Sequence, residues 1–117
     1  MSGVLVDTSV WVDHFRKRSA ALAGLIQLDQ ALTHPMVVTE LACGTPPVPR
    51  VRTLGDIALL RPAVQASLSE VQAFIEREQL FGLGCGLVDM TLLASTLMTP
   101  GARLWTLDRR LADLAQR

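Results

Sequence analysis

Four of the eleven acidic residues stand in apolar surroundings, where an unpaired carboxylate is costly to bury. Asp7 directly follows the apolar run VLV, and Asp108 follows RLWTL. Glu40 is the only charged residue in MVVTELACG, and Asp89 lies in LVDMTLL. Because acids ordinarily occupy solvated helix faces, we expect that position for the other seven: Asp13, Asp29, Asp56, Glu70, Glu76, Glu78 and Asp113.

Carboxylates that follow buried strands are suited to binding a divalent cation. In open α/β folds the ends of parallel strands share one edge, where ligands bind, and Asp7 and Asp108 should emerge there. Carboxylates gathered at one rim repel one another unless several hold protons or a cation neutralises them. Oxygen ligands in this number suit Mg²⁺ or Mn²⁺. We therefore predict a metal site at Asp7, Glu40, Asp89 and Asp108, although Asp108 would serve equally well as a helix N-cap.

The rest of the chain alternates short apolar segments with helical patterns. Strands are predicted at residues 4–6 and 103–106, and a very short strand within residues 61–66. Helices are predicted to carry residues 10–15, 19–29, 35–43, 51–60, 67–80 and 87–98, followed by a closing helix after Asp108. The helix at 87–98 is apolar nearly all round and is expected to be central and buried, and TPPVPR is predicted to be a stiff connector. The expected helix starts are Thr8 and Ser9 as N-caps, Pro35 as a first residue, and a Ser67/Glu70 capping box. This alternation predicts a parallel sheet covered on both faces.

Composition sets the broad class of the protein. The 117 residues are 50% hydrophobic, which suits a single domain over residues 1–117 with a real core. Eleven basic and eleven acidic residues cancel, so the net charge gives no argument for nucleic-acid binding, and it does not say where the charges lie. Cys43 and Cys85 are too few for a disulfide framework, and no apolar stretch is long enough to cross a bilayer. We expect a cytoplasmic protein.

The segments VLVDTSVWVDHF, HPMVVTELACG, GLVDMTLLAS and RLWTLDRRL together resemble the PIN-domain ribonucleases, and most closely the VapC toxins of toxin–antitoxin pairs. The resemblance runs in order through essentially the whole chain. It implies a PIN-like three-layer α/β/α sandwich with a short central parallel sheet. It also implies that Asp7, Glu40, Asp89 and Asp108 are the catalytic, metal-binding acids.

The resemblance extends to neighbouring hydroxyl groups. Thr8 and Ser9 match hydroxyl residues beside the first acid, and Thr106 matches one near the last, so supporting roles are implied for all three. Each also fits as a plain cap or strand residue. Many members carry a histidine two residues after the third acid, where this chain has Thr91. That difference puts a substrate or acid/base role at this position in doubt.

The function implied by the resemblance is a Mg²⁺-dependent endoribonuclease toxin, with Mn²⁺ as an alternative ion, that cleaves structured RNA such as transfer or ribosomal RNA. A homodimer and a VapB-type antitoxin, whose tail fills the active groove, are implied as well. With the four site acids set aside, eleven basic residues face seven acidic ones. The basic residues that would contact RNA phosphates, or simply be solvated helix ends, are Arg16, Lys17, Arg18, Arg50, Arg52, Arg109 and Arg110.

Other interpretations fit less well. A receiver or phosphatase domain also has an aspartate after its first strand, but usually needs a late lysine, and the only lysine here is Lys17. A zinc site would have to draw on His14, His34, Cys43 and Cys85, which lack short paired spacings. His14 is expected on a helix surface and His34 in a turn. A catalytically inactive PIN-like binding or scaffold module is the strongest alternative, and the presence of all four acids argues against it. An apolar face of Trp11, Phe15, Leu25 and Ile26 would serve either the core or an interface.

Overall fold

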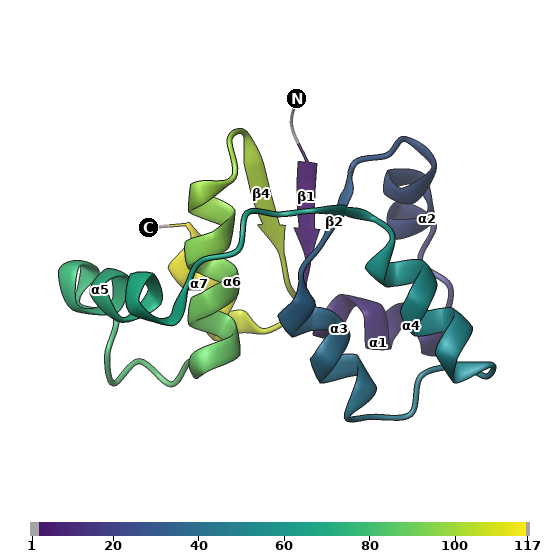
Figure 1. Cartoon of the computed structure of the whole chain (residues 1–117), viewed down its shortest axis with the longest axis horizontal. Coiled ribbons are helices and arrows are strands. Elements are labelled where there is room, and N and C mark those ends of the chain that lie inside the picture. The colour runs from purple at the N-terminus through teal and green to yellow at the C-terminus, as the bar shows by residue number, and fades with distance from the viewer. Residues whose placement is uncertain (1–2, 117) are drawn as a thin grey trace.

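The computed structural model describes residues 3–116, which form a four-stranded sheet and seven helices (Figure 1). The strands are β1 (Gly3–Val6), β2 (Ala31–Thr33), β3 (Arg61–Pro62) and β4 (Ala102–Trp105). The helices are α1 (Thr8–Arg16), α2 (Ala20–Gln27), α3 (Pro35–Ala42), α4 (Arg50–Ala58), α5 (Leu68–Glu78), α6 (Leu87–Met98) and α7 (Arg109–Ala115).

All strand pairs of the sheet are parallel, in the order β3-β2-β1-β4. The central strand β1 pairs Leu5 with Leu32 of β2 and with Leu104 of β4. Leu5 and Val6 are fully buried, as expected for a parallel strand covered on both faces. The predicted three-layer α/β/α arrangement is confirmed. The ends of β1 and β4 lie side by side, so the residues that follow them share one edge of the sheet.

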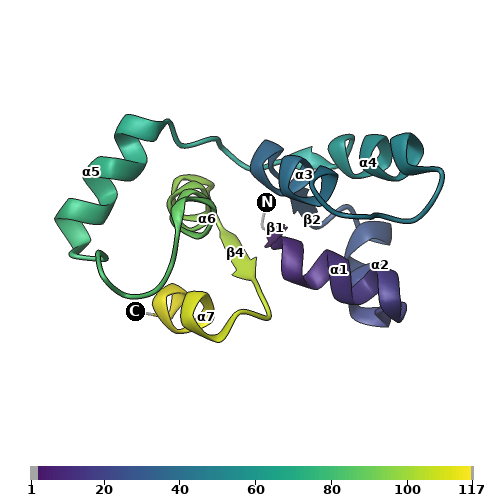
Figure 2. The same cartoon turned by 90° about the horizontal axis from the view of Figure 1, so that it is seen from below.

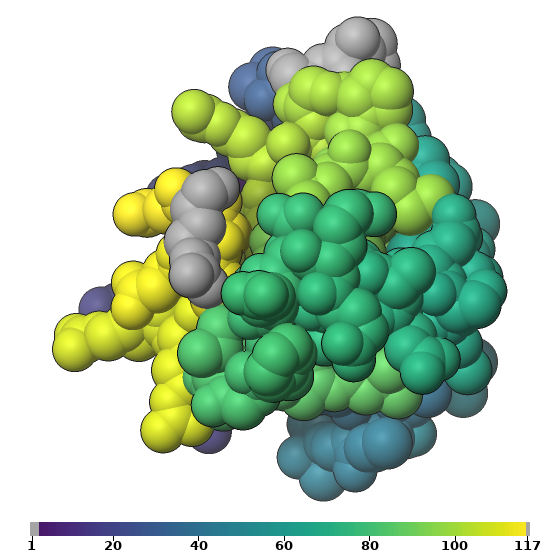
Figure 3. Space-filling model, turned by 90° about the vertical axis from the view of Figure 1, so that its left-hand side faces the viewer, coloured from purple at the N-terminus to yellow at the C-terminus, as the bar shows by residue number. Residues whose placement is uncertain are grey.

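The helices form two groups on either side of the strands, α1 to α4 in one and α5 to α7 in the other (Figures 1 and 2). The first group packs on a core around Leu5, Trp11, Leu22 and Val37. The second packs on a core around Phe74, Met90 and Leu111, with α5 over the middle of that face and α7 at its left edge (Figure 3). Helix α6 serves both cores, which confirms the prediction of a central buried helix.

The apolar face predicted from the first helices is used within the fold. Trp11 belongs to the first core, and Phe15, Leu25 and Ile26 pack against that core. Core packing is therefore the observed use of this face. None of the helices in residues 3–116 has the length and apolar character that a membrane span requires.

Several local predictions are confirmed and others are wrong. Pro35 begins α3, and Ser67 with Glu70 forms the capping box of α5. Strand β2 carried no strand prediction, because three residues are too few to show a periodicity. Strand β4 starts one residue earlier than predicted and ends before Thr106.

The N-terminal ends of α1 and α3 also differ from expectation. The N-cap of α1 is Asp7, not Thr8 or Ser9, and its side chain makes no capping hydrogen bond. His34, expected in a turn, is the buried N-cap of α3: its Nδ1 accepts a hydrogen bond from Met36 N at 3.0 Å. Its Nε2 lies 3.1 Å from Ser95 Oγ on α6. This contact ties α3 to α6.

Candidate active site at the carboxyl edge of the sheet

Asp7 is a buried carboxylate held by two hydroxyl groups. It lies at the end of β1 with 5% of its surface exposed. Its Oδ2 accepts hydrogen bonds from Ser9 Oγ and from Thr106 Oγ1, both at 2.7 Å. Hydrogen bonds to an ionised acceptor are stronger than neutral ones, so they offset part of the cost of burial. No hydrogen bond from residues 3–116 reaches Oδ1, which leaves that oxygen available to a ligand.

The two hydroxyl groups that hold Asp7 are themselves fixed by the backbone. Ser9 Oγ accepts a hydrogen bond from Leu107 N at 3.0 Å, and Thr106 Oγ1 accepts one from Asp108 N at 3.0 Å. A hydroxyl has one proton to donate, and here both protons go to Asp7. The network therefore connects the start of α1 to the loop between β4 and α7 and sets the orientation of the Asp7 carboxylate.

Asp108 both caps a helix and faces the other acids. Its Oδ1 accepts a hydrogen bond from Leu111 N at 3.1 Å, so it is the N-cap of α7, as one of the two interpretations predicted. Its negative charge also raises the pKa of Asp89, which lies on α6. The capping role uses Oδ1 and leaves Oδ2 without a partner in the described part of the chain.

Asp89 lies among the other three acids. Burial raises the pKa of Asp89 above its ordinary value, and the nearby charges of Asp108, Asp7 and Glu40 raise it further. The Gly86 backbone N, 3.4 Å from Asp89 Oδ2, donates a hydrogen bond that lowers the pKa of Asp89. The other three carboxylates therefore all lie within electrostatic reach of Asp89. A cation placed among them would favour the charged form of Asp89.

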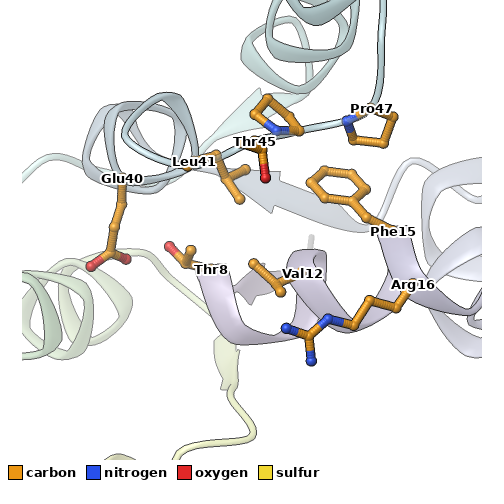
Figure 4. Close-up of a pocket in the computed structure, with 10 residues that line it drawn as sticks. Thr8, Val12, Phe15, Arg16, Glu40, Leu41, Thr45 and Pro47 are labelled. Atoms are coloured by element: carbon orange, nitrogen blue, oxygen red, sulfur yellow. The ribbon is translucent and has the colours of Figure 1, made fainter.

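Glu40 is the most loosely held of the four acids. It is exposed on α3 and makes no hydrogen bond or ion pair within residues 3–116. Figure 4 shows it beside Thr8 at one end of a pocket that both residues line. Thr8 Oγ1 is buried and, among the described residues, has no hydrogen-bond partner. Unlike Ser9 and Thr106, Thr8 does not contact Asp7 through its hydroxyl.

The donor set fits a hard divalent cation, but the side chains are spread out. Within residues 3–116, no three side chains of the Asp, Glu, His or Cys types lie close enough together to hold one metal ion. Like charges favour such a separation. Carboxylate oxygens are nevertheless the ligands that Mg²⁺ and Mn²⁺ prefer, and Asp7, Asp89 and Glu40 each have oxygens without a strong protein partner. Binding an ion would require the exposed Glu40 to approach the fixed Asp7.

The remaining sequence-predicted residues occupy distinct positions. Thr91 is buried and donates to Leu87 O at 2.7 Å, so its hydroxyl is used within α6. Burial, followed by the charges of Asp89 and Asp108, raises the pKa of the Cys85 thiol, which does not suit a nucleophile. Both cysteines are free, and the zinc cluster that was considered does not form among the described residues.

All seven basic residues proposed for RNA contact are exposed. Arg50 donates to Ala42 O at 2.7 Å and to Gly44 O at 3.1 Å, so it closes the end of α3. Arg110 lies near Cys85, and Arg16 lines the same pocket as Glu40. Among residues 3–116, no contact joins Lys17, Arg18, Arg52 or Arg109 to the site.

The wall of this pocket was missed by the sequence analysis. Thr45, Pro46 and Pro47 were predicted only as part of a stiff connector, yet all three line the pocket, and Thr45 and Pro47 lie across from Phe15 (Figure 4). The available signal was their position immediately after the helix that carries Glu40.

Comparison with known proteins agrees with this arrangement. Residues 4–117 match the PIN domain family. The chain is 43% identical over 108 residues to Ribonuclease VapC32 of Mycobacterium tuberculosis, from strain CDC 1551 / Oshkosh and equally from strain ATCC 25618 / H37Rv. The match covers 92% of this chain and 86% of each relative. The chain therefore belongs to the PIN-domain family and, within it, to the VapC type of ribonuclease.

Proposed function

We propose that the protein is a Mg²⁺-dependent endoribonuclease whose metal is held by Asp7, Glu40, Asp89 and Asp108, with Mn²⁺ able to replace Mg²⁺. The observation that carries the proposal is that the charges of Asp108, Asp7 and Glu40 all act on Asp89. The relationship to Ribonuclease VapC32 supports RNA as the substrate.

Each acid contributes in a different way to this mechanism. When bound, Mg²⁺ supplies a counter-charge for the scissile phosphate and lowers the pKa of an attacking water. Asp7 provides a fixed oxygen, because Ser9 and Thr106 hold its other oxygen in place. Asp89 favours the entry of a cation, because its charged form is disfavoured without one. Glu40 makes no hydrogen bond with the described residues, so it would be free to approach a bound ion from the α3 side of the rim.

The biological setting proposed here follows the VapC relationship. The chain works as one catalytic domain in the cytoplasm, forms a homodimer, and cleaves structured RNA such as transfer or ribosomal RNA. A VapB-type antitoxin holds it inactive. Arg16, which lines the same pocket as Glu40, and Arg110, which lies near Cys85, are the basic residues that we place first on the RNA backbone. Phosphate contacts of this kind position a strand without reading its sequence.

RNA cleavage by the purified protein tests the proposal. Wild-type protein should cut RNA in Mg²⁺ or Mn²⁺ and lose activity in EDTA. Asp7→Asn keeps the size of the side chain and its ability to accept from both hydroxyls, so it should fold normally and cleave at least about a thousandfold more slowly. An Asp7→Asn protein that cuts at the wild-type rate would exclude Asp7 from the metal site.

A catalytically inactive binding or scaffold module is the second candidate. It predicts RNA or protein binding that depends on neither ion and no cleavage under any ionic condition. Sequencing RNA ends after brief expression of wild type and of Asp7→Asn separates the two candidates and identifies the cleaved RNA.

A further inference from the structure

An open pocket of about 580 Å³ begins at Glu40 and continues between α1, α3 and the loop after α3 (Figure 4). Its walls are mainly apolar and include the aromatic ring of Phe15, together with Val12, Leu41, Pro46 and Pro47. A pocket of this size can take a small-molecule group with most of its surface buried. Because Glu40 lines both the pocket and the acidic rim, whatever enters the pocket lies next to the proposed site of cleavage.

The polar groups of the pocket are not used by the protein itself. Thr8 Oγ1 is buried and unpaired among residues 3–116. The Thr45 hydroxyl, which points into the pocket in Figure 4, makes no hydrogen bond with the described part of the chain. Arg16 lies at the edge of the pocket and forms no ion pair with those residues. The pocket therefore offers apolar walls, hydroxyl groups and one cation.

We propose that this pocket binds one unstacked nucleobase of the RNA, adjacent to the phosphate that is cleaved. The inference rests on the proposed ribonuclease function. It adds that one base of the RNA substrate is unstacked when the RNA is bound. A nucleobase has apolar faces that stack on aromatic rings and an edge that hydrogen-bonds to hydroxyls, which matches Phe15 and Thr45. Arg16 then lies where the negatively charged backbone of the same nucleotide enters.

The proposal restricts where the RNA is cut. A base within a duplex is paired along its edge and stacked on both faces, so it cannot enter a concave pocket without leaving the helix. Cleavage is therefore expected in a loop, a bulge or another unpaired segment of a structured RNA. An apolar peptide side chain would fill the walls equally well but would leave the Thr8 and Thr45 hydroxyls and the Arg16 charge unused.

The test begins with a library of RNA hairpins that carry randomised loops. Wild-type protein selects a cleaved loop, and product lengths identify the cut bond. Abasic nucleotides are then placed one at a time around that bond. Removing the base that occupies the pocket should lower kcat/KM by about tenfold to a hundredfold, the range measured for stacked bases, while removing the others should have little effect.

Two matched valine-to-tryptophan variants locate the effect in the pocket. Val12→Trp fills the pocket from a side chain that is 36% exposed. Val64→Trp makes the same change at a side chain that is 41% exposed. Val64 N donates to Thr99 Oγ1, just beyond the C-terminal end of α6. Asp89 lies in the first turn of the same helix, so Val64 is at the end of α6 away from the acid.

Val12→Trp should lower kcat/KM on intact RNA by the same factor as the abasic change, and the abasic penalty should then disappear. Val64→Trp should behave as wild type.

Two more conservative variants test the proposal if Val12→Trp does not fold. Phe15→Leu keeps apolar volume but removes the ring, and Thr45→Val removes an exposed hydroxyl at constant size. Both should reduce the abasic penalty.

The outcomes separate this inference from the proposed function. Cleavage that depends on Asp7, combined with an undiminished abasic penalty in the filled-pocket variants or with no abasic penalty at all, would overturn the base pocket and favour a peptide occupant. If wild-type protein cuts no hairpin in either ion, the proposed function fails and this inference fails with it.

Discussion

The two sides of the acidic rim are held in different ways. On the β4 side, Asp7 and Asp108 each accept hydrogen bonds that fix their positions. On the α3 side, Glu40 makes no hydrogen bond with the described residues and is exposed. The fixed side is integrated into the fold, whereas the free side can respond to ligands. Changes on the fixed side should therefore alter both stability and activity, and changes on the free side should alter activity alone.

The largest predicted effects are those of Glu40→Gln and Asp7→Ala, one variant on each side of the rim. Both should lower RNA cleavage by about a thousandfold or more, because each removes a proposed metal ligand. Asp7→Ala also leaves the Ser9 and Thr106 hydroxyls without their acceptor, which should cost about 1–3 kcal/mol in the free energy of unfolding. Glu40→Gln removes no hydrogen bond, so urea unfolding should match wild type. Cleavage assays and urea titrations on the same preparations measure both quantities.

Glu76→Gln is the control, because Glu76 is an exposed acid on α5 outside the rim. It should change neither quantity. An unfolding free energy that falls equally in Glu40→Gln and Asp7→Ala would contradict the distinction between the two sides of the rim.

The second prediction concerns the hydroxyl groups that orient Asp7. Ser9→Ala and Thr106→Val should each lower activity by about 10–100-fold, the usual cost of losing a group that positions a metal ligand. The Mg²⁺ concentration for half-maximal activity should rise, which a purely structural loss would not cause. Since both hydroxyls donate to the same Asp7 Oδ2, the double variant should lose less than the product of the two single effects.

A serine-to-alanine change elsewhere provides the control for this pair. Ser69→Ala, on the exposed first turn of α5, should leave the Mg²⁺ dependence unchanged. If the Ser9 and Thr106 variants slow cleavage with no change in Mg²⁺ dependence, the hydroxyls support the fold rather than the orientation of Asp7.

The sequence indicated which acids are unusual better than it indicated what they contact. Asp7 and Asp89 were recognisable because local apolar segments make a carboxylate conspicuous. The network that holds Asp7 was not recognisable, because it joins Ser9 to Thr106 through a contact that only the folded sheet creates. For the same reason His34, paired with Ser95 across 61 positions, was taken for a turn residue. Local pattern shows where a side chain is unusual, and tertiary structure determines what it contacts.

The third prediction separates the two roles of Asp108. Asp108→Asn keeps a side-chain oxygen that can accept from Leu111 N, since asparagine is a favourable N-cap. It should preserve stability and reduce activity through the lost charge alone. Asp108→Ala loses the cap as well and should cost about 1 kcal/mol in stability. Thermal unfolding and cleavage rates of the two variants give the comparison; equal stabilities would show that the cap contributes nothing.

The smallest predicted effect concerns His34, the N-cap of the helix that carries Glu40. His34 caps α3 by accepting through Nδ1 from Met36 N, so the neutral ring has its proton on Nε2, beside Ser95 Oγ.

Burial lowers the pKa of His34 below its ordinary 6.5. The unfolded chain therefore binds a proton more readily than the folded chain, and the stability contributed by neutral His34 is present above pH 6.5 and lost as pH falls through the lowered pKa. His34→Asn keeps a capping oxygen without a titratable ring, so its unfolding free energy should vary less with pH over this window than that of wild type. If the two proteins show the same pH dependence, a group other than His34 controls it.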